Sequence, residues 1–430
     1  MLFGALAACG EPDRILTGER LDIRAGLEAS TEAEAPAEIE IPALRLAAAA
    51  PNADWTHRGG SATHRLQHPE LGAALTQVFS VDIGQGDGRR VRLTADPVVA
   101  GGRVFTLDAN ATASAVSTAG VLLWQTDLTP PRDGRNDASG GGLAVSDAGV
   151  FVSTGFGEVS ALDPATGEVL WTQDLGAAGG SAPTVQGDLV YIAARDSRAW
   201  AIDATSGRIR WTLNGTPAQQ GFSGGAGAAV TDEIAIFPFA SGEVLAAFPL
   251  GGLRRWSTVV SGERLGVAAA TVSDIAGDPV IDGGRVYAAN VSGRLAALDV
   301  ATGERIWTAT EGAVSPVWPS GNSVFLVNDM GELLRLSSAD GAVLWRQPLP
   351  GFVENRVRRQ KTRFAHYGPV LAGGRLIVAS SDGELRQFDP ETGALLGSVP
   401  IPGGGATTNP AVAGGTLYVV TSRGQLVAYR

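Results

Sequence analysis

The sequence predicts an all-β fold, an eight-bladed β-propeller of four-stranded blades whose last blade is closed by an N-terminal strand. Three observations lead to this prediction. A unit of the form Ala-x-Asp-x-x-Thr-Gly, followed by a strand ending on Trp, recurs along the chain, for example at 297–307 and 161–171. A second pattern can be counted independently and gives eight copies, and the last copy lacks its fourth strand. Because one repeat cannot bury its own apolar face, the repeats decide the fold before any single residue does.

The second pattern is an apolar strand, a Gly-rich turn and another apolar strand. Six copies open on Pro, and two looser copies open on Leu or Ala. The copies stand at 97–105, 143–151, 183–191, 228–237, 279–287, 316–325, 369–377 and 410–418. The chain holds 58 glycines, which fits many tight turns, because glycine tolerates the positive φ that such turns require.

Six of the repeats continue into a strand that carries a tryptophan. These strands recur at intervals of roughly 40–50 residues, the length of a four-stranded blade. We expect the tryptophan to lie on the outermost strand and to pack between blades, with its indole N–H bonded to a partner. The Asp should bond backbone N–H groups of its own turn, and the Gly should take a left-handed conformation. The predicted blade tryptophans are Trp124, Trp171, Trp211, Trp256, Trp307 and Trp345, and Leu396 is predicted to take their place in the seventh blade.

Closure of the ring is predicted from the two ends of the repeat region. The eighth copy ends at Arg430 before a fourth strand, whereas the alternating stretch 75–81 has no first three strands before it. Phe79 of that stretch precedes Trp124 by one repeat interval. We therefore expect the N-terminal strand to complete the last blade, which leaves no long unpaired strand edge at the seam.

Composition excludes several classes of protein. The 430 residues are 44% apolar and 18% charged, as in ordinary β-rich globular proteins. The formal net charge of −11 argues against nucleic-acid binding, because phosphate backbones repel an acidic surface. Cys9 is the single cysteine, so an internal disulfide cannot form.

The N-terminal residues predict a membrane anchor. Residues 1–8 are treated as a signal-peptide remnant, 9–50 as an acidic Ala/Pro-rich tether and 51–430 as the propeller. The run from Leu6 to Gly10 resembles a bacterial lipobox, which predicts lipidation of Cys9. In lipoproteins an Asp directly after the cysteine favours retention in the inner membrane; the Gly10 found here resembles the signal for transport to the outer membrane. A complete signal peptide has a basic segment and a longer apolar segment, which we would expect upstream of Met1. A short helix within the tether is the alternative to an extended chain.

Two clusters could carry chemistry or binding. His57, His64 and His68 are closely spaced, but Gly59-Gly60, Pro69 and the lack of a nearby cysteine favour a polar surface segment over a metal site. The Gly-rich run 221–225 lacks the Gly-Lys-Ser/Thr ending of a phosphate loop. No catalytic constellation can be assigned, so no catalytic residue, cofactor or metal is expected.

A basic loop, 354–364, stands out in the acidic chain. Its cations are Arg356, Arg358, Arg359, Lys361 and Arg363. It is interpreted as a solvated loop, with contact to an acidic partner or to lipid headgroups as the alternative.

The repeat resembles the tryptophan-docking repeat of eight-bladed quinoprotein-type propellers. Together with the lipobox and the tether, it resembles the BamB family, periplasmic lipoproteins of the β-barrel assembly machine in the outer membrane of Gram-negative bacteria. The resemblance covers Cys9 and 55–430. It implies a non-enzymatic scaffold, lipid-anchored at the periplasmic face of the outer membrane. Such a scaffold docks the POTRA domains of the barrel-inserting subunit, and the resemblance implies nascent outer-membrane proteins as a further class of partner.

The resemblance also implies where docking occurs. The family's docking loops join the third to the fourth and the fourth to the fifth blade, here 214–225 and 261–278. A Leu-x-Leu-Arg patch aligns with Gln220, Phe222 and Ser223, of which only Phe222 is apolar. An acidic position maps onto Asp274, and a second one meets Ala276.

Two other functions fit the same repeat. One is a periplasmic propeller that binds another protein or a polysaccharide. The other is a quinone-dependent dehydrogenase, but that family's pattern includes a vicinal cysteine pair and insertions between blades, whereas this chain has one cysteine and compact repeats.

Overall fold

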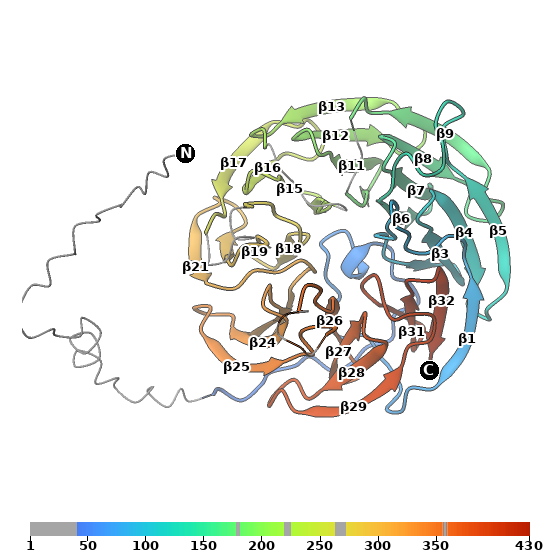
Figure 1. Ribbon diagram of the computed structural model, residues 1–430. Coiled ribbons are helices and arrows are strands. Elements are labelled where there is room, and N and C mark those ends of the chain that lie inside the picture. Colours follow the sequence, from blue (N-terminus) through green and yellow to red (C-terminus); the bar gives the residue numbers. More distant parts are fainter. Residues whose placement is uncertain are drawn as a thin grey trace, which may run out of the picture. The chain divides into compact units, whose positions relative to one another are not determined.

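The strands of this protein form a ring of eight four-stranded sheets, as the computed structural model shows (Figure 1). The structure describes residues 41–177, 181–218, 225–262, 272–354, 356, 358 and 360–430. Within this part of the chain the predicted all-β fold of eight blades is confirmed. The folded unit begins at Ala43, eight residues before the expected boundary at 51. The last residues assigned to the tether contact the propeller, since the backbone N–H of Arg45 donates to Asn322 Oδ1 at 3.2 Å.

The blades follow one another along the chain. The first four are β2 (Val98–Ala100), β3 (Arg103–Leu107), β4 (Thr112–Ser117) and β5 (Leu122–Asp127); β6 (Gly141–Ser146), β7 (Gly149–Thr154), β8 (Glu158–Leu162) and β9 (Val169–Asp174); β10 (Thr184–Gln186), β11 (Leu189–Ala193), β12 (Arg198–Asp203) and β13 (Ile209–Asn214); β14 (Ala229–Val230), β15 (Ala235–Pro238), β16 (Glu243–Ala247) and β17 (Arg254–Val259).

The other four blades are β18 (Val280–Asp282), β19 (Arg285–Ala289), β20 (Leu295–Asp299) and β21 (Arg305–Ala309); β22 (Trp318–Ser320), β23 (Ser323–Val327), β24 (Glu332–Ser337) and β25 (Val343–Pro348); β26 (His366–Ala372), β27 (Arg375–Ser380), β28 (Glu384–Phe388) and β29 (Leu395–Pro400); β30 (Ala411–Ala413), β31 (Thr416–Val420) and β32 (Gln425–Tyr429) with β1 (Gln77–Asp82). A 3-10 turn, η1 (Arg58–Gly60), lies near the ring axis (Figure 1).

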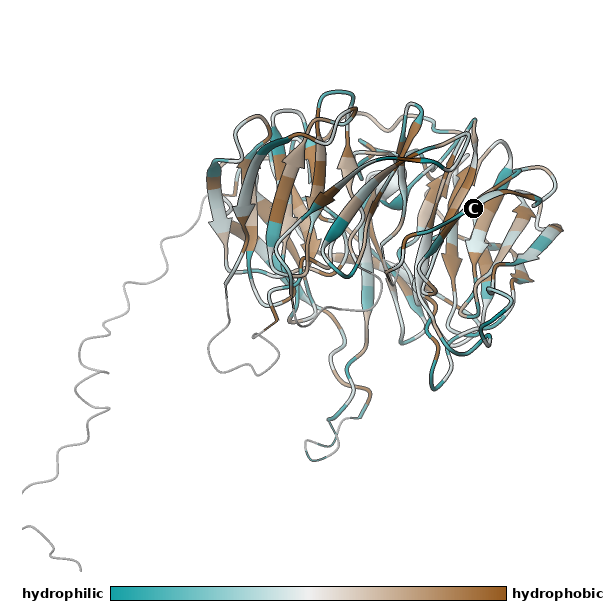
Figure 2. Ribbon diagram, turned by 90° about the horizontal axis from the view of Figure 1, so that it is seen from above, coloured by the Kyte–Doolittle hydropathy of each residue, from teal (hydrophilic) through white to brown (hydrophobic). Residues whose placement is uncertain are grey.

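Burial follows the position of each strand in its blade. The middle strands are buried along their length, as in β7 and β11, because neighbouring blades cover both faces of the sheet. The outermost strands alternate between exposed and half-buried residues, as in β5 and β9, because one face meets solvent at the rim. Apolar residues accordingly line the strands, and hydrophilic residues collect toward the two faces of the ring (Figure 2).

The ring closes as predicted. β1 pairs antiparallel with β32, and Phe79 lies opposite Ala428. Thr76 and Arg430 extend this pairing through two backbone hydrogen bonds of 2.9 Å. The first strand of the body therefore supplies the outer strand of the eighth blade, and the two ends of the body are joined by main-chain bonds.

The repeated turn has the predicted chemistry. Asp163 Oδ1 accepts from the backbone N–H groups of Ala165 and Thr166, both at 2.8 Å. Gly167 closes the turn with φ +75°, a conformation that only glycine adopts without strain. The same carboxylate contacts recur in the turns that begin at Asp203, Asp299 and Asp389.

The blade tryptophans join neighbouring blades. Each indole N–H donates to a carbonyl in the turn between the third and fourth strands of the next blade; the pairs are Trp124 with Pro164, Trp171 with Ala204, Trp211 with Pro249, Trp256 with Val300, Trp307 with Ser338 and Trp345 with Pro390, at 2.9–3.3 Å. Each indole also covers the glycine of that turn, so that a Cβ on Gly167 would lie 2.6 Å from Trp124. Each of the six indoles therefore lies between its own blade and the next.

The prediction for the seventh blade is wrong. Gly397 lies opposite Gln387, in the register that the tryptophans occupy elsewhere, and Leu396 is 56% exposed. The reason is the seam, because β32 and β1 are the two ends of the body and no turn connects them. A tryptophan in the seventh blade would have no turn glycine to cover.

Candidate docking face

The two faces of the ring carry different connections. One face holds the tight turns after the first strand of each blade and after the third strand of the first seven blades. The other, which we call the loop face, holds the connections between blades, including 215–228, 260–279 and 349–365. Both segments predicted to dock a partner therefore belong to the loop face. Gln220, Phe222 and Ser223 lie outside the described residues, as does Cys9.

Glu243 holds the base of the first of these segments. Its Oε2 accepts from the backbone N–H of Thr216 at 2.6 Å, and its Oε1 accepts from the Ser257 hydroxyl at 2.5 Å. Burial favours the neutral carboxyl, but these hydrogen bonds outweigh it and hold the pKa of Glu243 below its usual value. Sequence analysis missed this residue, because a single Glu at the start of a strand carries no recognisable signal.

Asp274 does not lie on the surface. Its side chain is 4% exposed, and its backbone carbonyl accepts from the N–H of Val291 at 3.1 Å. The neighbouring Ile275 and Ala276 are buried as well. In this conformation Asp274 supports the stem of the loop, and a direct contact from its carboxylate to a partner does not fit the structure.

The ring axis is filled by the chain's own residues 52–69, which we call the axial segment. This segment forms hydrogen bonds to all eight blades, at the backbone of Val99, Val145, Val185, Val230, Ile281, Pro319, Gly373 and Gly414. It supplies main-chain groups to six of the blades and the side chains of His57 and Arg65 to the other two. The axial segment therefore links every blade to every other through one stretch of chain.

The three histidines of this region are buried, which corrects their interpretation as a polar surface segment. His57 Nε2 lies 3.0 Å from the backbone nitrogen and 3.1 Å from the carbonyl oxygen of Val185, within hydrogen-bond distance of both. Burial is the main reason that the pKa of His57 falls to about 3. His64 Nδ1 lies 2.9 Å from the Pro279 carbonyl, and the Gly374 N–H donates to His68 Nε2 at 2.7 Å. Among the described residues, no group of three potential ligands is placed to hold a metal ion.

Arg58 is the charged centre of the axial segment. Its Nε lies 2.8 Å from Asp96 Oδ2, and its Nη1 lies 3.1 Å from Asp278 Oδ1. Burial lowers the pKa of Arg58, but the two carboxylates raise it more, so the guanidinium stays charged. Burial raises the pKa of Asp96, opposed by Arg58 and by two hydrogen bonds of 2.9 Å from Asn409. A buried charge that is paired in this way ties the axial segment to the first and fifth blades.

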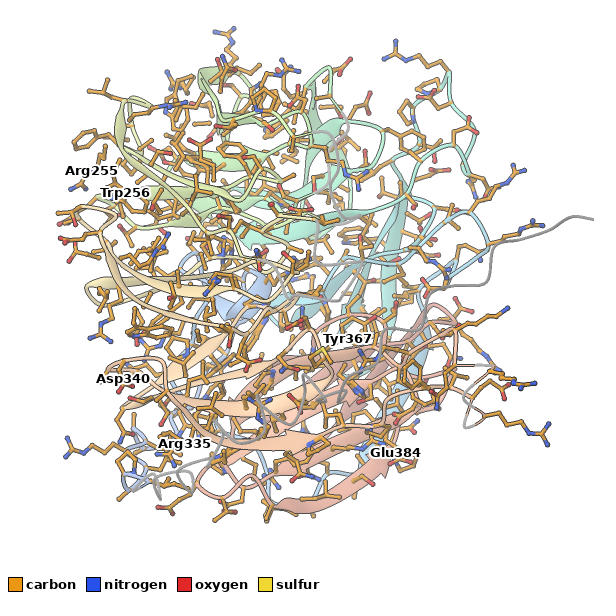
Figure 3. The ribbon with its side chains drawn as sticks, turned by 60° about the vertical axis from the view of Figure 1, so that its left-hand side comes forward. Arg255, Trp256, Arg335, Asp340, Tyr367 and Glu384 are labelled. Atoms are coloured by element: carbon orange, nitrogen blue, oxygen red, sulfur yellow. The ribbon has the colours of Figure 1, made fainter. Side chains whose placement is uncertain are left out.

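Two open cavities lie side by side on the loop face. The first, of about 530 Å³, covers Arg58 and is lined by residues of the first, seventh and eighth blades, such as Thr94, Tyr367 and Thr407. The second, of about 290 Å³, lies between the sixth and seventh blades. Arg363, Ala365 and Tyr367 line both cavities, as does Val314. Tyr367 lies inside the ring, whereas Arg255 and Trp256 lie at the rim (Figure 3).

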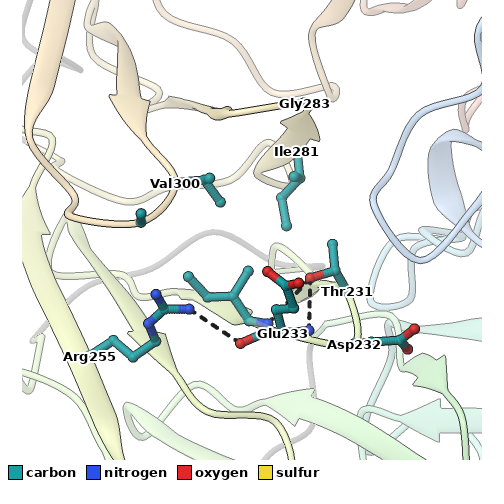
Figure 4. Close-up of a pocket in the computed structure, with 9 residues that line it drawn as sticks. Thr231, Asp232, Glu233, Arg255, Ile281, Gly283 and Val300 are labelled. Atoms are coloured by element: carbon teal, nitrogen blue, oxygen red, sulfur yellow. Dashed lines mark hydrogen bonds between the residues drawn. The ribbon is translucent and has the colours of Figure 1, made fainter.

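A further cavity of about 350 Å³ lies between the fourth and fifth blades (Figure 4). Thr231 Oγ1 accepts from the backbone N–H groups of Glu233 and Ile234, and Arg255 donates to the Glu233 carbonyl. None of its nine lining residues, all of which the structure describes, has a buried side-chain polar atom without a partner. The cavity therefore has no preformed polar group that awaits a ligand.

These observations define the class of protein, an eight-bladed propeller of tryptophan-docking repeats whose axis is filled by its own N-terminal segment. The model of the family described as outer membrane protein assembly factor BamB matches residues 109–347 and 354–430. The chain belongs to this family.

Relatives and solved structures agree with this assignment. The outer membrane protein assembly factor BamB of Yersinia pestis is 27% identical over 360 residues, covering 82% of this chain and 88% of the relative. That of Escherichia coli K12 is 25% identical over 354 residues, covering 81% and 87%. The crystal structure of BamB from Moraxella catarrhalis superimposes with a TM-score of 0.68 at 20% identity, over 83% of this chain and 100% of that one.

The fold alone is shared more widely. Quinohemoprotein alcohol dehydrogenase from Comamonas testosteroni has a TM-score of 0.66 at 16% identity, over 89% of this chain and 81% of that one. Among the described residues, none forms a helix with the length and apolarity needed to cross a bilayer.

Proposed function

We propose that this chain is a non-enzymatic scaffold subunit of the outer-membrane protein assembly machine. In this proposal it docks the periplasmic POTRA domains of the barrel-inserting subunit and thereby aids the insertion of β-barrel proteins. Membership in the family of outer membrane protein assembly factors carries the proposal. The relatives are named as assembly factors rather than as enzymes. The fold alone would not separate a scaffold from a dehydrogenase, since both use this propeller.

The loop face supports docking through the segments 215–228 and 260–279. Their stems are held by buried groups, through Glu243 for the first and through the backbone of Asp274 for the second. Long connections on stems fixed in this way can present side chains to a partner without loosening the ring. Phe222 is the proposed apolar anchor, since interfaces concentrate their binding energy in a few such residues.

The same proposal includes a lipid on Cys9 that holds the ring at the periplasmic face of the outer membrane, with residues 10–42 as the tether. A single acyl chain gives weak membrane binding, so two or more chains are needed for a stable anchor. Cys9→Ser should therefore move the protein from the membrane to the soluble periplasmic fraction and leave the folded ring unchanged.

Co-purification tests the docking. An affinity-tagged full-length chain should retain the barrel-inserting subunit after mild detergent extraction, and Phe222→Glu should reduce the amount recovered. Leu250→Glu is the matched control, because Leu250 is 84% exposed on a turn between third and fourth strands, on the opposite face. Equal recovery of the barrel-inserting subunit with both variants would argue against docking through the 215–228 loop. No recovery of that subunit with the unmodified chain would refute the scaffold role.

A further inference from the structure

The two ends of the basic loop pair antiparallel, with Phe352 opposite Arg363. We call residues 351–364 the basic hairpin; 355, 357 and 359 are outside the described residues. The backbone N–H of Val353 donates to the Thr362 carbonyl at 3.0 Å, and that of Phe364 donates to the Gly351 carbonyl at 2.9 Å. His366 Nε2 lies 2.9 Å from the Pro350 carbonyl. The Arg363 guanidinium lies 5.3 Å from the centre of the Phe352 ring, a cation–π contact. The base of the hairpin is therefore fixed to the propeller.

The tip of the basic hairpin presents cations without internal partners. Arg356, Arg358 and Lys361 are exposed and, within the described part of the chain, form no hydrogen bond or ion pair. The chain as a whole carries a net charge of −11, so this hairpin is a local exception. Lys361 is the single lysine of the sequence. Such a concentration of one charge attracts an oppositely charged partner and orients its approach.

The base of the basic hairpin is apolar and adjoins a depression. Phe352, Val353, Val314 and Met330 are large apolar side chains that remain exposed. Arg363 connects them, since it stacks on Phe352, donates to the Met330 carbonyl and lines both cavities together with Val314. The two cavities adjoin at these shared residues, and together we call them the groove, which extends from above Arg58 to the base of the hairpin.

We propose that the basic hairpin and this groove bind an extended, acidic segment of a protein partner that also carries apolar side chains. The carboxylates would pair with Arg356, Arg358 and Lys361, and the apolar side chains would lie in the groove against Phe352 and Val314. A lipid surface fits less well, because it is planar and, among the residues that the structure describes, the exposed apolar ones stand at the base of the hairpin rather than at its tip. The interaction uses a part of the loop face separate from 215–228 and 260–279, and it does not depend on the proposed function.

The single lysine provides a direct test. A carbodiimide joins a carboxylate to a primary amine without a spacer, so Lys361 is the one side chain of this protein that can donate the amine. The probe is a short synthetic peptide alternating Asp or Glu with Leu or Phe, blocked at its N-terminus and with a labelled C-terminal amide. We expect a peptide adduct on Lys361 in the mass spectrum of the tryptic digest. Lys361→Arg is the control, because it keeps the charge and removes the amine.

Affinity measurements separate the hairpin from general charge attraction. Arg356→Glu combined with Arg358→Glu should weaken binding of the acidic peptide about tenfold or more at moderate salt, since close charge pairs at interfaces contribute on this scale. Arg208→Glu combined with Arg305→Glu makes the same change in net charge at exposed residues after the third-to-fourth-strand turns and should change affinity less than about twofold. Phe352→Ser should weaken the mixed peptide but leave polyglutamate binding unchanged.

Several results would overturn the proposal. Equal binding of a peptide in which Asn and Gln replace the acids would remove the role of charge. If the Arg208 and Arg305 variant lost as much affinity for the peptide as the Arg356 and Arg358 variant, the effect would come from net charge alone. Binding to phosphatidylglycerol vesicles without binding to the peptide would assign the hairpin to lipid headgroups, and adducts on the chain's amino terminus alone would place the peptide elsewhere.

Discussion

Phe79 of the eighth blade packs against Gly120 of the first blade, in the arrangement that the six tryptophans form with the turn glycines of the next blades. A Cβ on Gly120 would lie 2.7 Å from Phe79 Cγ, just as a Cβ on Gly207 would lie 2.7 Å from the Trp171 ring. The strand that closes the eighth blade therefore also supplies the aromatic residue that packs it onto the first. Closure and blade spacing are consequently set by the same short segment.

Gly120→Ala tests this contact. Gly101 is the matched control, because both glycines have positive φ, +85° and +55°, but a Cβ on Gly101 would meet nothing within 4 Å. Each variant should lose roughly 1–2 kcal/mol from the left-handed backbone. Gly120→Ala should lose about 1–3 kcal/mol more, from overpacking against Phe79. Equal midpoints of urea unfolding for the two variants would show that Phe79 does not press on Gly120.

The indole hydrogen bonds should contribute measurably to stability. Trp171→Phe leaves the buried Ala204 carbonyl without its donor at 2.9 Å, which should cost about 1–3 kcal/mol beyond the loss of packing. Trp318→Phe is the control, because the Trp318 N–H is buried and has no partner among the described residues. The difference between the two unfolding free energies measures the hydrogen bond. A larger loss for Trp318→Phe would contradict the account.

Arg58 should be necessary for the axial segment to remain in place. Arg58→Met leaves Asp96 and Asp278 buried without their cation, which should cost about 3–5 kcal/mol, as is typical when one partner of a buried ion pair is removed. Adding Asp96→Asn and Asp278→Asn should recover part of that loss, because the uncompensated charges are then gone. Chemical denaturation of the three proteins measures both effects. A triple variant less stable than Arg58→Met alone would refute the electrostatic explanation.

The ring could be predicted from the sequence, because each blade carries its own copy of the repeat within a short stretch of chain. Asp163 and Gly167 stand at fixed spacing before Trp171, and the eight copies of the other pattern, an apolar strand, a turn and an apolar strand, leave one strand missing that the Phe79 stretch can supply. The axial segment's position inside the ring could not be predicted in this way. His57 and Arg58 belong to a polar, Gly-containing stretch typical of a surface, and their burial depends on eight inner strands brought together from the whole chain. Likewise, the absence of a tryptophan near Leu396 follows from the seam, which is a property of the closed ring.

Stability should fall on mild acidification. The pKa of His57 is about 3 in the folded protein, whereas its ordinary value is 6.5. Between these two pH values the imidazole is protonated in the unfolded chain and neutral in the folded protein. The stability from neutral His57 is present above pH 6.5 and is lost as the pH falls toward 3, by up to about 1.4 kcal/mol per pH unit for one group. Burial shifts the pKa of His64 in the same direction.

Unfolding measured between pH 7 and pH 4 tests this slope. His64 acts on the pKa of His57, and Asp278, Arg58 and Asp96 act on the pKa of His64. His57→Gln should reduce the slope between pH 6.5 and pH 4, because glutamine cannot take up the proton. An unchanged slope in His57→Gln would show that the acid sensitivity comes from other groups.

Photo-crosslinking in cells tests the central claim, that the loop face docks the assembly machine. A photoreactive amino acid at position 222 should attach the POTRA domains of the barrel-inserting subunit, whereas the same amino acid at position 250, on the opposite face, should not. Adducts from position 250 with none from position 222 would contradict the account.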